Sequence, residues 1–240
     1  MRRGAAPAVV LLVLGIAASA CGDSTPSGST LPPDAGAILR YAGDAMQALR
    51  SVRFELERSG APVYLDGSGL LAFKSAVGEY ASPGSARAVI DVETPVAVFE
   101  IGSIAIGEQQ WATNPLTQKW DELPPGSAFN PVLLFDSELG WKPLLSEDVT
   151  EASLVGLVDL DGEPRYYLRG RARGRRVRVL TVGLAGEQPV DLELWVDPET
   201  GRVVRLAFTT VTPDGDATDW LLTLSQFDEP VEPIDPPVTG

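Results

Sequence analysis

Histidine is absent from the 240-residue sequence, and cysteine occurs once, as Cys21. The absence of histidine excludes catalytic triads with an imidazole base and most transition-metal sites. We find no glycine-rich phosphate-binding loop, and the stretch from Asp159 to Gly162, which resembles the start of a calcium loop, lacks the later oxygen ligands and fits a hairpin turn better. We therefore expect no enzyme, no metal site and no cofactor. An envelope enzyme that uses carboxylates alone is the weakest alternative.

Basic residues are also scarce. The sequence has 19 lysines and arginines against 33 acidic residues, which gives a net charge of −14. Such an acidic surface disfavours binding to nucleic acid and unassisted adsorption to anionic lipid. Nucleic acid is therefore not an expected partner.

Long apolar segments are missing as well. The longest runs from Ala5 to Ala17, which is shorter than the ~20 residues that a helix needs to cross a bilayer. It follows Arg2 and Arg3 and ends in small residues, the pattern of a secretory signal peptide. We expect residues 1–20 to be this signal peptide, and the chain to be exported without a transmembrane anchor.

The segment from Ala18 to Cys21 resembles a bacterial lipobox, in which the chain is cut just before a cysteine whose sulfur is diacylated. The alternative is an ordinary signal cleavage followed by an incidental thiol. A free thiol is a liability in an oxidising compartment and has no second cysteine to pair with, whereas two acyl chains give stable anchoring. We therefore predict lipidation of Cys21, a flexible linker at residues 21–33, and an outward-facing location at the cell membrane.

The pattern after the linker changes from helix to strand. Apolar residues at helical spacing follow Asp34, a good N-cap, which predicts a helix at 35–50. From Val52 onward apolar and polar residues alternate, as in strands with one wet face. Further strands are expected at 63–73, 76–81, 86–93, 96–106, 109–113, 118–123, 150–159, 164–173, 176–184, 189–196, 202–212 and 217–227.

Turn residues at 161–162, 197–201 and 213–215 join successive strands closely, so we expect antiparallel neighbours in one long meander. The segment 126–148 breaks the alternation and is expected to hold one or two short helices, capped by Asn130 with Pro131 at the first helical position.

Together these elements predict an α+β fold. The expected fold is a large curved antiparallel β-sheet, a half-barrel of roughly 10–12 strands, wrapped around an N-terminal helix and a short helical insert. Residues 34–228 are expected to form a single domain, followed by a proline-rich tail at 229–240. Because strands outnumber the helices that could cover them, the concave side is not expected to be completely filled.

Seven arginines gather between Arg165 and Arg178. On a strand, Arg165, Arg169, Arg171 and Arg173 share one face. One interpretation is that this face meets anionic headgroups, either of a bound lipid or of a membrane surface. The other is that the arginines pair with acids on neighbouring strands.

Three stretches resemble a known family, the mycobacterial LppX, LprA, LprF and LprG lipoproteins. They are QWATNPLTQKWDELP at 110–124, LWVDPETGRVVRLAF at 194–208 and LTLSQFDEPVEPIDPP at 222–237. The resemblance implies a curved sheet around helices, similar to the LolA and LolB carriers, with an apolar cavity that binds an acylated lipid or glycolipid and moves it within the cell envelope. It implies no catalytic residues.

We therefore expect a membrane-anchored, monomeric lipid carrier, with an envelope transporter as a further partner. The rival hypothesis is a lipid-anchored interaction or regulatory module that has a solid core. The helical insert is the segment expected to cover the cavity. The residues expected to line the cavity, each of which could instead be ordinary core, are Ile38, Leu39, Met46, Leu49, Phe54, Leu56, Leu71, Phe73, Phe99, Ile101, Leu133, Leu134, Trp141 and Leu145.

Overall fold

A computed structural model describes residues 34–65, 69–124 and 129–239, so the signal peptide, Cys21 and the linker lie outside the described residues. The helices and helical turns are α1 (Ala35–Gln47), η1 (Pro131–Phe135), α2 (Trp141–Pro143), η2 (Leu144–Asp148) and α3 (Gly174–Leu180). The strands are β1 (Ser51–Gly60), β2 (Val63–Tyr64), β3 (Ala72–Ala81), β4 (Ser85–Glu93), β5 (Val98–Ile106), β6 (Gln109–Thr113), β7 (Trp120–Leu123), β8 (Val149–Leu160), β9 (Glu163–Ala172), β10 (Val190–Val196), β11 (Val203–Val211) and β12 (Ala217–Ser225).

All strands belong to one antiparallel sheet, in the order β7-β6-β5-β4-β3-β1-β12-β11-β10-β9-β8, with β2 paired beside β3. The prediction of one long meander is wrong, because the sheet consists of two meanders that join where β1 pairs with β12. The segment 124–148 carries the chain from β7 at one edge to β8 at the other. Short turns fix neighbours only within each meander, so they could not reveal this junction.

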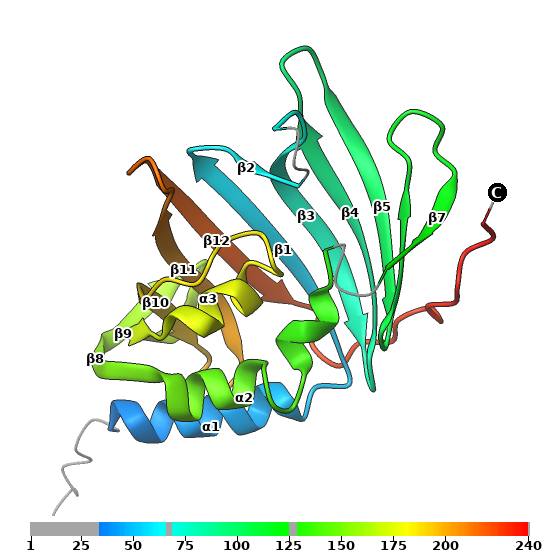
Figure 1. Ribbon diagram of the computed structural model, residues 1–240. Helices are drawn as coiled ribbons and strands as arrows, with labels where there is room; N and C mark the ends of the chain where they lie inside the picture. Colours follow the sequence, from blue (N-terminus) through cyan, green and yellow to red (C-terminus); the bar gives the residue numbers. More distant parts are fainter. Residues whose placement is uncertain (1–33, 66–68, 125–128, 240) are drawn as a thin grey trace, which may run out of the picture. The chain divides into compact units, whose positions relative to one another are not determined.

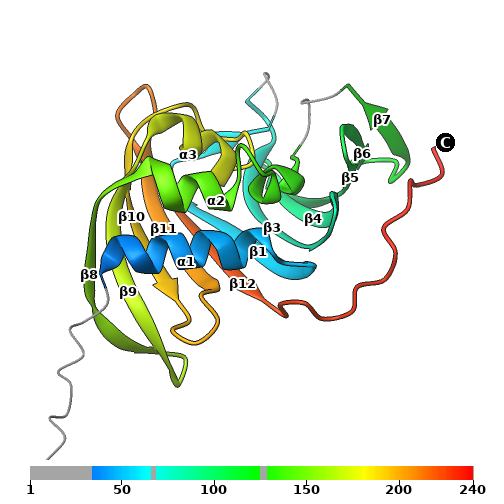
Figure 2. The same cartoon turned by 90° about the horizontal axis from the view of Figure 1, so that it is seen from below.

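The edges β7 and β8 do not pair with each other, so the sheet is an open, curved half-barrel, as predicted (Figure 1). α1, α2, η2 and α3 lie on the concave side of the part formed by β8 to β12 (Figures 1 and 2). Over the part formed by β3 to β7, the described cover is mainly η1, which contacts β4, β5 and α3. The two parts of the sheet are therefore unequally covered.

α1 begins where the sequence predicted and ends slightly earlier. The Asp34 carboxylate accepts a hydrogen bond from the Ala37 amide (3.1 Å), which caps the first turn. Ile38, Leu39 and Met46 are buried against the rest of the core. This buried stripe attaches α1 to α2, η2 and β8.

Several turns form as predicted. Asp161 and Gly162 both have positive φ (58° and 88°), and the Asp159 carboxylate accepts a hydrogen bond from the Gly162 amide, so this stretch is the β8–β9 hairpin turn. In the β10–β11 turn, the Asp197 carboxylate accepts hydrogen bonds from the Glu199 and Thr200 amides.

The strand predicted at 176–184 is wrong, because residues 174–180 form α3 instead. The alternating valines there suggested a period of two. In the structure Arg176, Val177 and Leu180 are the buried residues, which is a helical spacing. The strand predicted at 63–73 is also shorter, since only Val63–Tyr64 pairs, with the start of β3.

Candidate functional site

A cavity of about 990 Å³, partly open to solvent, lies on the concave face of β4, β5 and β6. Its volume is at the upper end of the range of roughly 300–1,000 Å³ that ligand pockets span. The described residues that line it are Tyr64, Leu65, Pro83, Gly84, Ile90, Ile101, Ser103, Gly107, Glu108, Gln110, Ala112, Phe129, Asn130, Val132, Leu133, Asp136, Leu139, Arg175, Arg178, Val179, Val182, Gly183, Leu184 and Glu187.

The floor of the cavity consists of inward-facing strand residues. Ile90 of β4 pairs with Ile101 of β5, and both line the cavity. Val89, next to Ile90 in the chain, is 48% exposed on the opposite face. Alternation along the strands therefore gives the floor an aliphatic surface.

One wall is η1, and its position follows from local hydrogen bonds. The Asn130 side chain accepts a hydrogen bond from the Val132 amide (3.1 Å), with Pro131 at the first position, as predicted. The Ser103 hydroxyl donates to the Phe129 carbonyl (3.2 Å), which fastens the start of η1 to β5. Val132 and Leu133 then face the cavity.

The opposite wall comes from α3 and the segment that follows it. Val179, Val182 and Leu184 present aliphatic side chains to the cavity. Covering apolar surface that is exposed to water lowers the free energy by roughly 25 cal/mol per Å². The two walls and the floor are therefore suited to hydrocarbon.

Charged side chains line the cavity as well. The cations are Arg175 and Arg178 of α3, and the anions are Glu108, Asp136 and Glu187. The Asp136 carboxylate stabilises its own turn, because it accepts hydrogen bonds from the Glu138 and Leu139 amides (both 2.8 Å). The cavity is therefore amphipathic.

A buried cluster of charges fixes α3 beside the insert. Asp148 is fully buried and accepts hydrogen bonds from Arg173 (3.2 Å), from Arg175 (2.7 and 2.9 Å) and from Arg176 (2.5 Å). Burial alone would raise the pKa of the Asp148 carboxyl, but hydrogen bonds and positive charge from Arg175 and Arg176 outweigh burial and lower it. Asp148 is therefore ionised at neutral pH.

Arg176 extends this cluster to the wall of the cavity. Its Nη1 donates to the carbonyl oxygens of Glu138 (3.1 Å) and Leu139 (2.6 Å), and Leu139 lines the cavity. We name Asp148, Arg173, Arg175 and Arg176 the Asp148 cluster. It joins the end of η2, the Glu138–Leu139 stretch and α3, and no local sequence pattern indicates it.

The structure brings only part of the predicted cavity lining to this cavity. Ile101 and Leu133 line it. Leu71 and Phe99 are partly buried and pack against the core. The remaining predicted residues lie in the buried core: Ile38, Leu39, Met46, Leu49, Phe54, Leu56, Phe73, Leu134, Trp141 and Leu145.

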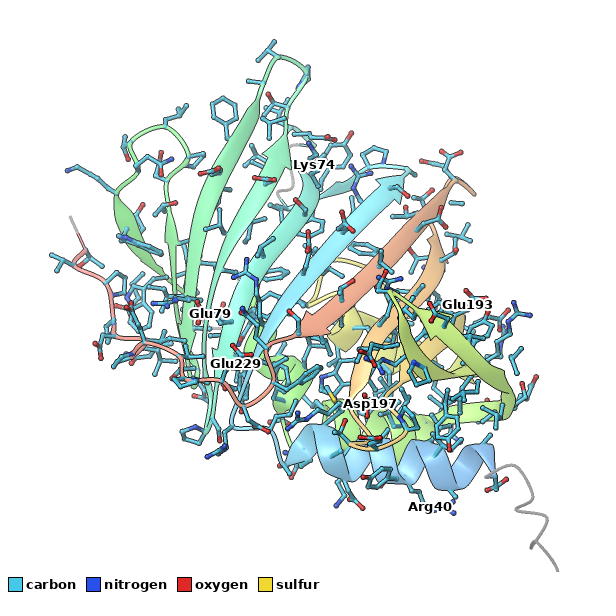
Figure 3. The ribbon with its side chains drawn as sticks, turned by 180° about the vertical axis from the view of Figure 1, so that it is seen from behind. Arg40, Lys74, Glu79, Glu193, Asp197 and Glu229 are labelled. Atoms are coloured by element: carbon cyan, nitrogen blue, oxygen red, sulfur yellow. The ribbon has the colours of Figure 1, made fainter. Side chains whose placement is uncertain are left out.

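The arginine-rich stretch divides into two groups. Arg165, Arg169 and Arg171 on β9 form ion pairs with Asp197 (3.1 Å), Glu193 (3.1 Å) and Asp191 (2.8 Å), the last two on the neighbouring strand β10. Figure 3, which views the molecule from behind relative to Figure 1, labels Glu193 and Asp197. For these three arginines the prediction of pairing with acids is confirmed.

Among the described residues, no helix has the length and apolar character to span a membrane, and no group of three or more acidic, histidine or cysteine side chains could hold a metal ion.

A family model described as LppX_LprAFG lipoprotein matches residues 34–233. Among solved structures, LprF from Mycobacterium bovis is similar with a TM-score of 0.62 and 19% identity, over 87% of this chain and 99% of that one. The lipoprotein LppX from Mycobacterium tuberculosis is similar with a TM-score of 0.58 and 20% identity, over 84% of this chain and 98% of that one. No curated protein matches the sequence.

Proposed function

The chain belongs to the LppX_LprAFG lipoprotein family, and from this premise we propose that it binds the acyl chains of a lipid or glycolipid in the cavity and carries that lipid within the cell envelope. The observation that carries the proposal is the cavity of about 990 Å³ between η1, α3 and the strands β4 to β6. The rival hypothesis, an interaction module with a solid core, gives no reason for a cavity of this size.

The proposed mechanism is passive. Each methylene that leaves water for the cavity contributes roughly 0.8 kcal/mol. A lipid that leaves a bilayer gains nothing by that route, because it leaves one apolar environment for another. Transfer therefore requires a cavity with an affinity near that of the membrane, together with a cover that opens.

We propose the helical insert as this cover. η1 lies over the floor strands and contacts α3, the opposite wall. Hydrogen bonds to Ser103 and Arg176 hold the two ends of its segment. Movement of η1 away from β4 and β5 would expose the aliphatic floor.

Lipidation of Cys21 would keep the carrier at the membrane. The linker of residues 21–33 separates that cysteine from α1, and a segment of this length extends to at most ~45 Å. The domain would therefore remain close to its lipid source while it reorients.

A tryptophan at position 101 tests the proposal. Ile101→Trp fills part of the floor, and loss of space for only two methylenes weakens binding by roughly 1.6 kcal/mol, or about tenfold. The measurement is the affinity for a neutral fluorescent diacylglycerol, by titration of the delipidated protein.

Val89→Trp is the matched control, since Val89 lies on the neighbouring strand and faces outward. The control is expected to bind the probe as the unsubstituted protein does. Equal affinity of all three proteins, or no uptake of the probe by any of them, would count against the carrier.

A further inference from the structure

Two arginines of α3 line the cavity, and one of them, Arg178, differs from the paired arginines of β9. Arg178 is exposed, lines the cavity, and within the described part of the chain takes part in no ion pair or side-chain hydrogen bond. It lies on the same helix as Val179, an aliphatic residue of the wall. A cation thus adjoins apolar surface in one cavity.

The guanidinium group of Arg175, one helical turn before Arg178, is only partly engaged in hydrogen bonds. Its Nη2 binds both oxygens of Asp148, and its side chain remains 57% exposed. The hydrogen bonds and charge of Asp148 raise the pKa of the Arg175 guanidinium, so it stays cationic. Its spacing of three residues from Arg178 places both on one side of α3.

The Asp148 cluster holds more positive than negative charge, since one carboxylate receives three guanidinium groups. Opposing charges are present at the cavity. Glu187 belongs to the segment after α3, Asp136 is engaged by its own turn, and Glu108 belongs to the β5–β6 turn with Gly107. Of these anions, Glu187 is the one expected to compete for the arginines.

We propose that Arg175 and Arg178 bind the anionic headgroup, a phosphate or phosphodiester, of the lipid whose acyl chains occupy the cavity. The inference rests on the proposed function and adds the charge of the ligand to it. The aliphatic walls receive the hydrocarbon, and the two guanidinium groups meet the phosphate at the α3 side. Guanidinium groups suit this role because their planar N–H donors match phosphate oxygens.

The test compares two lipids with identical chains, dioctanoyl phosphatidate and dioctanoyl glycerol, as competitors of the neutral fluorescent diacylglycerol. The unsubstituted protein is expected to bind phosphatidate about tenfold more tightly than the glyceride, the effect of one charge-assisted hydrogen bond. Inorganic phosphate alone is the third competitor.

Arg178→Gln is expected to remove most of this preference, measured as the ratio of the affinities for the two lipids, so that any effect common to both lipids cancels. Arg53→Gln, which removes an exposed arginine of β1, is the control with the same change of net charge, and is expected to keep the preference. Glu187→Gln is expected to increase the preference, because it removes the competing anion.

Equal binding of the two lipids by the unsubstituted protein would overturn the headgroup site and leave the cavity intact. A preference that survives in Arg178→Gln would also overturn it, and so would inorganic phosphate that competes as well as phosphatidate does. If neither lipid displaces the probe, the headgroup site and the carrier function fail together, which is a distinct result.

Discussion

The Asp148→Asn variant is expected to unfold with a free energy about 3–5 kcal/mol lower than that of the unsubstituted protein. The substitution removes the one negative charge of the Asp148 cluster and leaves the Arg176 side chain, 5% exposed, without a counter-ion. Removal of one partner of a buried ion pair costs this much because the other charge stays buried. Urea denaturation at pH 7 measures the loss.

Asp191→Asn is the control, since the Asp191 carboxylate is 82% exposed and pairs with Arg171 on the surface. An exposed pair contributes at most about 1 kcal/mol. A similar loss of stability in both variants would contradict the role given to burial.

The same cluster predicts a dependence on pH. The pKa of the Asp148 carboxyl is lowered in the folded protein, so its stabilising effect is fully present above the ordinary carboxyl pKa of about 4 and is lost as the pH falls through the lower, folded value. Stability measured from pH 6 to pH 2 should therefore fall less steeply in Asp148→Asn.

The Cys21→Ala variant is expected to leave the membrane. Two acyl chains on Cys21 would anchor the protein stably, because each buried methylene contributes roughly 0.8 kcal/mol, and the variant would have neither chain. Detergent phase partition should place the unsubstituted protein in the detergent phase and the variant in the aqueous phase.

Ser24→Ala, three residues further along, should partition like the unsubstituted protein and have the mass of a lipidated chain. If the unsubstituted protein has a free thiol and the mass of the bare polypeptide, the prediction of a lipid anchor is contradicted.

The sequence predicted the kinds of element better than their connections. Alternation and turn residues such as Asp161 and Gly162 are local signals, and they located most strands and the hairpins. The union of β1 with β12 depends on contacts between distant segments, which no local pattern encodes. α3 was missed because its valines also alternate. In the structure its buried side includes Arg176, which pairs with Asp148.

The position of the cavity was harder to predict than its chemistry. The surplus of strand over helix indicated an incompletely covered sheet, and two of the residues expected at the cavity wall, Ile101 and Leu133, are among those that line the cavity. Leu39 and Met46 have the same apolar character, yet α1 packs closely where the sheet is well covered. Val182 and Leu184 were missed because residues 176–184 were expected to be a strand.

The pairing of Arg53 with Ser225 has a consequence for the order of folding. Each meander can assemble from neighbouring hairpins, but the middle of the sheet requires strands from distant parts of the chain. Contacts of such long sequence separation slow folding, because a large loop must close before they form. The junction of β1 and β12 is therefore expected to be the last part of the sheet to form and the first place where hydrogen exchange reports delayed protection during refolding.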